Sequence, residues 1–103
     1  MSENVFVKSG RVTDILAATT IGEGAGPWMY KDAPKAAIQV VATAAATVEF
    51  EVSNDGINAV DTLLGTVTLA AAGSDGFTTD APWKYIRAVV TANSGTVNVT
   101  MSV

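Results

Sequence analysis

The chain has 103 residues and a formal net charge of −4, with six basic residues, ten acidic residues, no histidine and no cysteine. The basic residues are scattered, so the sequence offers no basic stripe for direct binding of nucleic acid. The absence of cysteine excludes disulfides and thiolate metal sites, and no apolar run is long enough to span a bilayer. We therefore expect one domain over 1–103, with no cofactor and no nucleic-acid or membrane partner.

Charged residues make up 16% of the chain, against about 25% in an average globular domain. Many of the apolar residues are alanine or valine, which predicts a thin core. A small domain with such a core buries a small share of its surface. We therefore expect neighbouring chains to contribute to its stability in an assembled state.

Turn signals recur at short intervals along the chain, which is typical of an all-β sandwich. One of these signals is Gly73-Ser74-Asp75-Gly76, and the alanine run Ala42–Ala46 reads as a bend between two strands. Between the signals we predict strands over 5–8, 11–18, 27–31, 36–43, 47–53, 62–70, 83–92 and 96–103. The first strand belongs to a short N-terminal arm, about 1–8, which is suited either to extending a neighbour's sheet or to pairing inside its own domain.

Two segments show the alternation of a half-buried strand most clearly. In 47–53, Val48, Phe50 and Val52 alternate with polar or charged residues, so one sheet face is apolar and the other is charged. In 83–103, two alternating runs flank Asn93-Ser94-Gly95. The second pattern predicts a C-terminal hairpin.

Three segments carry a resemblance to a family of small phage virion proteins. They are Val48-Glu49-Phe50-Glu51-Val52-Ser53-Asn54-Asp55-Gly56-Ile57-Asn58, Ala81-Pro82-Trp83-Lys84-Tyr85-Ile86-Arg87-Ala88-Val89-Val90 and Asn93-Ser94-Gly95-Thr96-Val97-Asn98-Val99. The resemblance implies an antiparallel, jelly-roll-like β-sandwich of about eight strands. It further implies a head decoration (cement) protein that binds across subunits of the major capsid protein, as a homotrimer on the outer capsid surface of the virion.

The same resemblance leaves two alternatives. A tail, neck or baseplate structural protein is the nearest variant. The segments are also similar to galactose-binding-like and discoidin-type sandwiches, which implies a carbohydrate-binding module.

The candidate partner-binding residues lie in two segments. Val5 and Phe6 belong to the N-terminal arm, and Trp28, Met29 and Tyr30 follow a glycine-rich loop, Gly22–Gly26. Tryptophan, tyrosine and methionine are enriched in interface cores, which favours a docking patch. In the alternative, Trp28 and Tyr30 point into the core and Met29 points outward, and for Trp28 alone this alternative is favoured.

A second aromatic group lies at the start of the predicted strand 83–92. Trp83, Tyr85 and Arg87 share one side of a strand in the predicted alternation, as in a platform that stacks sugar rings. The favoured interpretation is that Trp83 and Tyr85 close one end of the sandwich beneath Arg87, because large aromatic side chains usually fill cores.

No pattern in the sequence predicts catalysis or metal binding. The Gly22–Gly26 loop lacks the P-loop lysine, and Pro27 removes one backbone donor. Glu49 and Glu51 read as a solvated face that can meet Lys84 or Arg87 across strands. Without histidine or cysteine, a nucleophile has few groups to activate it, so we expect no enzyme. The acidic residues in turns lack EF-hand spacing and are explained by capping of the backbone: Asp55, Asp61, Asp75 and Asp80.

Overall fold

The computed structural model describes residues 5–7, 12–19 and 23–103, and every regular element in this part of the chain is a β-strand. It therefore holds no helix that is long and apolar enough to cross a membrane. The strands are β1 (Val5–Val7), β2 (Val12–Thr19), β3 (Gly24–Ala25), β4 (Met29–Lys31), β5 (Ala36–Ala42), β6 (Ala46–Ser53), β7 (Gly65–Leu69), β8 (Gly73–Thr79), β9 (Tyr85–Asn93) and β10 (Val97–Ser102).

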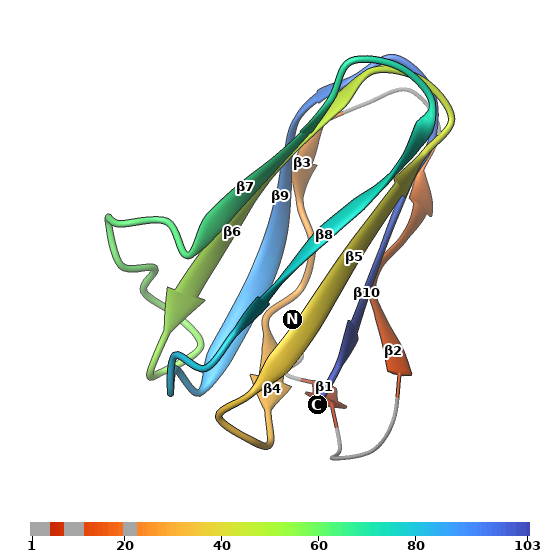
Figure 1. Cartoon of the computed structure of the whole chain (residues 1–103). Coiled ribbons are helices and arrows are strands. Elements are labelled where there is room, and N and C mark those ends of the chain that lie inside the picture. The colour runs from red at the N-terminus through yellow and green to blue at the C-terminus, as the bar shows by residue number, and fades with distance from the viewer. Residues whose placement is uncertain (1–4, 8–11, 20–22) are drawn as a thin grey trace.

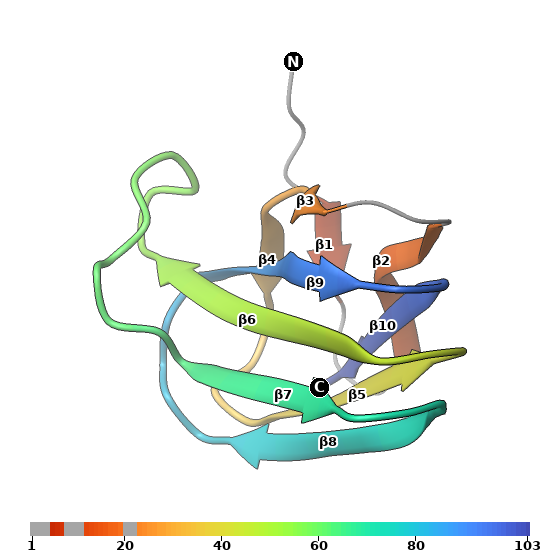
Figure 2. The same ribbon diagram turned by 90° about the horizontal axis from the view of Figure 1, so that it is seen from above.

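The strands form two sheets that pack face to face (Figures 1 and 2). The six-stranded sheet has the order β1-β4-β9-β6-β7, with β3 also paired to β9. The four-stranded sheet has the order β2-β10-β5-β8. Neighbours within each sheet are thus mostly distant in the sequence.

The pairing of these distant strands identifies the sandwich as a jelly roll. β2 pairs with β10, β4 with β9, β5 with β8 and β6 with β7, all antiparallel. The chain from β2 to β10 is therefore one long hairpin that has rolled up into two sheets. Because β3 and β4 both lie along β9 as one interrupted strand, eight strands make up the roll. The predicted all-β, jelly-roll-like sandwich is confirmed.

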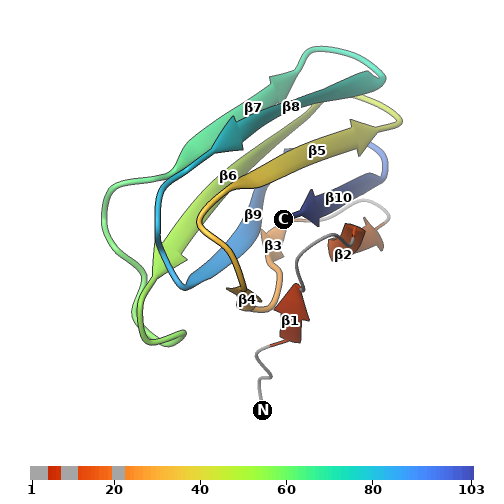
Figure 3. The same ribbon diagram turned by 60° about the horizontal axis from the view of Figure 1, so that its bottom comes forward.

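β1 is an addition to the roll. Its three residues pair in parallel with β4, with Phe6 opposite Tyr30, and Figure 3 shows β1 beside β4 at the edge of the six-stranded sheet. The described part of the arm thus pairs inside its own domain, as one of the two predicted alternatives has it. Residues 1–4 and 8 of the predicted arm lie outside the described residues.

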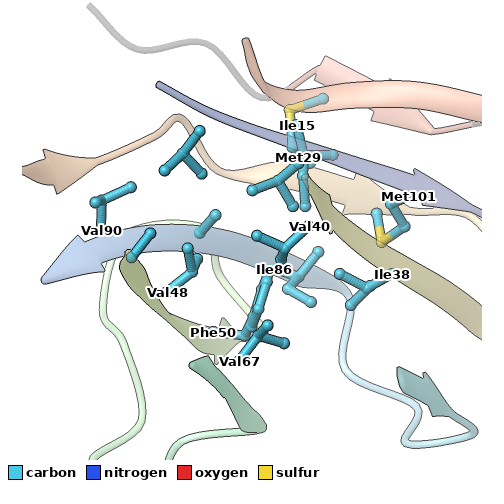
Figure 4. Close-up of a cluster of buried hydrophobic side chains, with 14 of the residues drawn as sticks. Ile15, Met29, Ile38, Val40, Val48, Phe50, Val67, Ile86, Val90 and Met101 are labelled. Carbon is cyan, nitrogen blue, oxygen red and sulfur yellow. The ribbon is translucent and has the colours of Figure 1, made fainter. Parts of the chain in front are cut away.

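The core lies between the sheets and follows the strand alternation. Every second residue of β5 is buried, starting at Ala36, and the same holds for β6 from Ala46 to Val52. Phe50 is fully buried, and its ring meets that of Phe77 edge to face at 5.3 Å, which ties the two sheets together. Figure 4 shows Phe50 in this cluster, next to Val67 and Ile86.

The predicted C-terminal hairpin is wrong. β9 lies in the six-stranded sheet between β4 and β6, whereas β10 lies in the four-stranded sheet between β2 and β5. The segment between them crosses from one sheet to the other. A turn sequence shows where the chain reverses, but the apolar stripe on each strand decides which partner covers it, and here both partners come from distant segments.

β8 occupies the segment that the sequence predicted to be a turn around Gly73-Ser74-Asp75-Gly76. Its first four residues have low β-propensity, but a neighbouring strand explains the sequence. A Cβ atom on Gly76 would collide with the carbonyl oxygen of Ile38 on β5. Glycine at this position therefore permits close approach of the two backbones, which overrides propensity.

The glycine-rich segment before β4 is also ordered by pairing. Gly24 and Ala25 form β3 opposite Val90 and Val89, and the Gly26 amide donates to the Ala88 carbonyl at 2.8 Å. Gly24 adopts a φ of 144°, a conformation that favours glycine. The described part of this segment is thus a short strand paired with β9. Its amides donate to protein carbonyls and do not form a phosphate site.

Candidate partner-binding surface

The outer side of the six-stranded sheet carries a mixed aromatic and charged patch across β4, β9 and β6. Along β9, Ile86, Ala88 and Val90 are buried, so the residues between them face outward. The strand register places Tyr30 opposite Tyr85, and Glu51 opposite Arg87. We call this patch the aromatic face; its residues are Trp28, Tyr30, Glu51, Tyr85 and Arg87.

Arg87 is the centre of the aromatic face. Its Nε donates to Glu51 Oε1 at 2.6 Å, and Nη2 lies 2.6 Å from the same oxygen. Its guanidinium also lies 4.5 Å from the centroid of the Trp28 ring, a geometry that contributes about 0.5–2 kcal/mol. Both charged side chains are about a quarter exposed, at 28% and 24%. The ion pair is therefore held in one geometry but stays within reach of a partner.

The two tyrosines extend the face across the β4–β9 pair. Tyr30 and Tyr85 meet edge to face, with ring centroids 5.4 Å apart and an angle of 70° between the ring planes. Both side chains are half-buried. Tyrosine, tryptophan and arginine in packed, half-covered positions are the residues that dominate protein–protein binding energy.

The structure places the three predicted partner-binding residues of the Trp28-Met29-Tyr30 segment on two different sides of β4. Met29 pairs with Ile86 and shares its inward face, so it packs in the core at 2% exposure and no partner can reach it (Figure 4). Trp28 and Tyr30 lie on the other side of β4, which reverses the predicted alternative in which they entered the core. Trp28 is nonetheless only 6% exposed, beneath Arg87.

The other predicted contacts are only partly described. The backbone of Val5 and Phe6 lies in β1, beside the aromatic strand β4, which places it at the border of the aromatic face. Their side chains lie outside what the structure describes, so their partner contacts remain a prediction. The structure still shows why the sequence alone left Trp28–Tyr30 and Tyr85–Arg87 as separate groups, since only the β4–β9 pairing brings them together.

Trp83 does not join the aromatic face. It precedes β9 and packs against the core at one end of the sandwich, as the favoured interpretation had it. Tyr85 contacts Tyr30, and Arg87 covers Trp28 instead of Trp83. The predicted row of Trp83, Tyr85 and Arg87 is therefore not a continuous platform.

The turn after β6 is organised by one carboxylate. Asp55 Oδ1 accepts the backbone amides of Ile57 and Asn58 at 2.8 and 2.9 Å and the Ser53 hydroxyl at 2.7 Å, while Oδ2 accepts Asn58 Nδ2 at 2.9 Å. These hydrogen bonds, with the Asn58 amide the strongest contribution, lower the pKa of Asp55 well below its ordinary range. The capping role predicted for this aspartate is thus present in the geometry.

The other predicted turn aspartates do not gather around Asp55. No group of three or more acidic, histidine or cysteine side chains that could hold a metal ion occurs in the described part of the chain. The aspartates concerned are Asp61, Asp75 and Asp80.

The low pKa of Asp55 predicts a loss of stability in acid. In the unfolded chain, Asp55 binds a proton below its ordinary pKa of about 3.9, whereas in the folded chain it remains ionised there. The free energy of unfolding therefore falls as the pH drops. We expect Asp55→Asn to be less stable than the parent at pH 7 and to approach it at pH 2.5. Urea unfolding between pH 7 and pH 2.5 measures this. Asp61→Asn, in the same loop, is the control; an equal change in its acid profile would contradict the assignment.

The strand pairing and the aromatic face together define the class of protein: a jelly-roll β-sandwich with an ordered aromatic and charged patch on the outer side of its larger sheet. No protein-family model matches the chain, and no curated protein matches it in sequence.

Among solved structures, the fold is similar to that of the SPBc2 prophage-derived protein YomS, with a TM-score of 0.70, 12% identity and 88% of each chain covered. A Bacillus endospore appendage protein, from a family of disulfide-linked pili, aligns with a TM-score of 0.44 and 19% identity over 90% of this chain and 72% of that one. A CBM4 structure aligns at 0.34 and 10% over 89% and 68%. At these identities the likeness to YomS shows a shared fold, and the two lower scores carry no argument.

Proposed function

We propose that this chain is a structural virion protein of a bacteriophage and that it acts as a non-enzymatic decoration protein on the outer surface of the capsid. The fold likeness to a prophage-derived protein supports the phage setting. The observation that carries the docking role is the aromatic face, in which Arg87 bridges Trp28 and Glu51 in a fixed geometry.

The physical mechanism is burial of this face against capsid subunits. A preorganised arginine–aromatic patch loses little side-chain freedom on docking, so more of its contact energy appears as affinity. Assembly as a homotrimer would place three such faces on one capsid site, and avidity would multiply weak individual contacts. Separation of the capsid subunits would then require the buried face to be exposed again.

The geometry of the patch favours a protein partner over a sugar. A sugar-stacking platform needs aromatic rings that lie open and flat, whereas Tyr30 and Tyr85 stand at 70° to each other and Trp28 is covered by Arg87. For this reason we do not propose the carbohydrate-binding alternative here.

The test is binding to particles of the phage that encodes the chain. Labelled protein is mixed with purified heads and, separately, with purified tails, and bound protein is measured after density-gradient sedimentation. We expect saturable binding to heads and a trimer mass by light scattering. Binding to tails alone would move the role to the tail, neck or baseplate. A monomer that binds neither particle would overturn the proposal.

A variant of the aromatic face gives the sharper prediction. We expect Arg87→Gln to weaken head binding by about 30-fold, because interface anchors of this kind cost about 2 kcal/mol or more when truncated. Thr78→Ala is the matched control, since Thr78 is exposed on β8 of the opposite sheet. Unchanged head binding by a folded Arg87→Gln variant would remove the aromatic face from the interface.

A further inference from the structure

A small cavity lies where the turn after β4 meets the segment before β9. Its volume is about 220 Å³, and its walls include Lys31, Asp32, Pro34, Pro82, Trp83 and Lys84. Figure 1 shows the turn after β4 at the end of the sandwich opposite the β5–β6, β7–β8 and β9–β10 connections. The cavity is separate from the aromatic face, because Lys31 and Met29 lie on the inward side of β4.

Two lysines face each other at this cavity. The Lys31 amide donates to the Lys84 carbonyl at 2.7 Å, one step beyond the Tyr30–Tyr85 pair. Residues placed opposite each other share one side of a sheet, and like charges in this position are destabilising. Neither ammonium group forms an ion pair with a carboxylate in residues 5–7, 12–19 and 23–103. The cavity therefore holds two ammonium groups and the carboxylate of Asp32, none of them in a salt bridge within the described part of the chain, so its net charge is positive.

Lys31 is unusual because it is buried, at 3% exposure. Its Nζ donates to the carbonyls of Ala33 and Pro34 at 2.7 and 2.9 Å. An ammonium group has three donors, so one N–H of Lys31 has no acceptor in the described part of the chain. Burial and, secondly, the charge of Lys84 lower the pKa of Lys31. An anion in the cavity would oppose both effects, because an opposite charge stabilises the protonated ammonium.

We propose that this cavity binds a single carboxylate group, with the carboxylate at Lys31 and Lys84 and its carbon stem against Trp83. The apolar walls favour a carboxylate on a carbon stem over a fully hydrated anion such as phosphate. The volume is below the range of about 300–1,000 Å³ that is typical of whole small-molecule sites, so the cavity suits an end group. An acidic sugar and an acidic side chain of a protein partner both present this group. The proposal does not depend on the virion role.

The test is a titration of the ¹⁵N-labelled protein, followed by amide NMR at pH 7 and constant ionic strength. The probes are D-glucuronate, N-acetyl-L-glutamate α-amide, inorganic phosphate and D-glucose. We expect both carboxylates to shift the amide signals of 31–33 and 83–84 saturably, with dissociation constants of about 1–10 mM, and glucose to shift none. Tighter binding of glucuronate points to an acidic sugar, and tighter binding of the glutamate derivative points to a protein side chain.

Two lysine variants complete the experiment. Lys84→Gln removes one of the two charges, and we expect it to weaken carboxylate binding by about tenfold. Lys35→Gln, which changes an exposed lysine outside the cavity wall, is expected to bind as the parent does. The proposal is overturned if no carboxylate gives a saturable shift, if phosphate binds at least as tightly as both carboxylates, or if Lys84→Gln binds as well as the parent.

Discussion

We expect Phe50→Ala to lower the free energy of unfolding by about 3–5 kcal/mol, the range for truncation of a buried aromatic side chain. Phe50 is fully buried, and its ring contacts Phe77 across the two sheets at 5.3 Å. The substitution leaves a void at the point where β6 meets β8, and the thin, alanine-containing core around it offers few side chains that can move in. A domain of this size has a total stability of about 5–15 kcal/mol, so the loss is a large share of it.

Urea unfolding monitored by tryptophan fluorescence measures this loss. Phe50→Leu is the matched control, because it keeps most of the volume and is expected to cost about 1.5 kcal/mol or less. The error of such a comparison is about 0.5 kcal/mol. If Phe50→Ala lowered the free energy of unfolding by less than about 1 kcal/mol, the sheets would not be held together at this position.

The second large effect is expected at Gly76. A Cβ atom there collides with the Ile38 carbonyl oxygen and comes within 3.2 Å of the Gln39 Cα. Both obstacles are backbone atoms of the paired strand β5, so no side-chain rotation can relieve the contact. We expect Gly76→Ala to cost about 3 kcal/mol, the upper part of the usual range for overpacking, and to separate β8 locally from β5.

Gly73 provides the control for this prediction within the same strand. A Cβ on Gly73 meets its nearest atoms at 3.9 Å, which is ordinary van der Waals contact. We expect Gly73→Ala to be close to neutral in thermal unfolding, and to leave hydrogen exchange of the β5 amides unchanged. Faster exchange of these amides in Gly76→Ala is the expected signature. Equal melting temperatures for the two variants would show that the β5–β8 approach is looser than described.

The fold class could be predicted because alternation is a local property. The runs Val48–Val52, Ile86–Val90 and Val97–Met101 each place every second residue in the core, as a strand with one covered face requires. The bend at Ala42–Ala46 could also be predicted from the local sequence, and in the structure β5 ends at Ala42 and β6 begins at Ala46. Neither pattern contains information about which strands pair.

The candidate site could be predicted only in fragments. Four of its members stood out by residue type: Trp28, Tyr30, Tyr85 and Arg87. They come together in one patch only because β4 pairs with β9, over a separation of more than fifty residues. For Glu51 the sequence left open a solvated face or a contact with Lys84 or Arg87 across strands, and the β6–β9 register places it opposite Arg87. Met29 appeared equivalent to its neighbours, and only its position opposite the buried Ile86 assigns it to the core.

The sequence by itself therefore determined the strand class, the apolar side of the main strands and the turn held by Asp55, because each depends on interactions within a few residues. The tertiary structure decided the rest. It assigned β9 and β10 to different sheets, made a strand of the glycine-containing segment 73–79, and placed Lys31 opposite Lys84 beside a cavity. These features depend on which distant backbone covers each strand, and that choice is made by packing of the whole core.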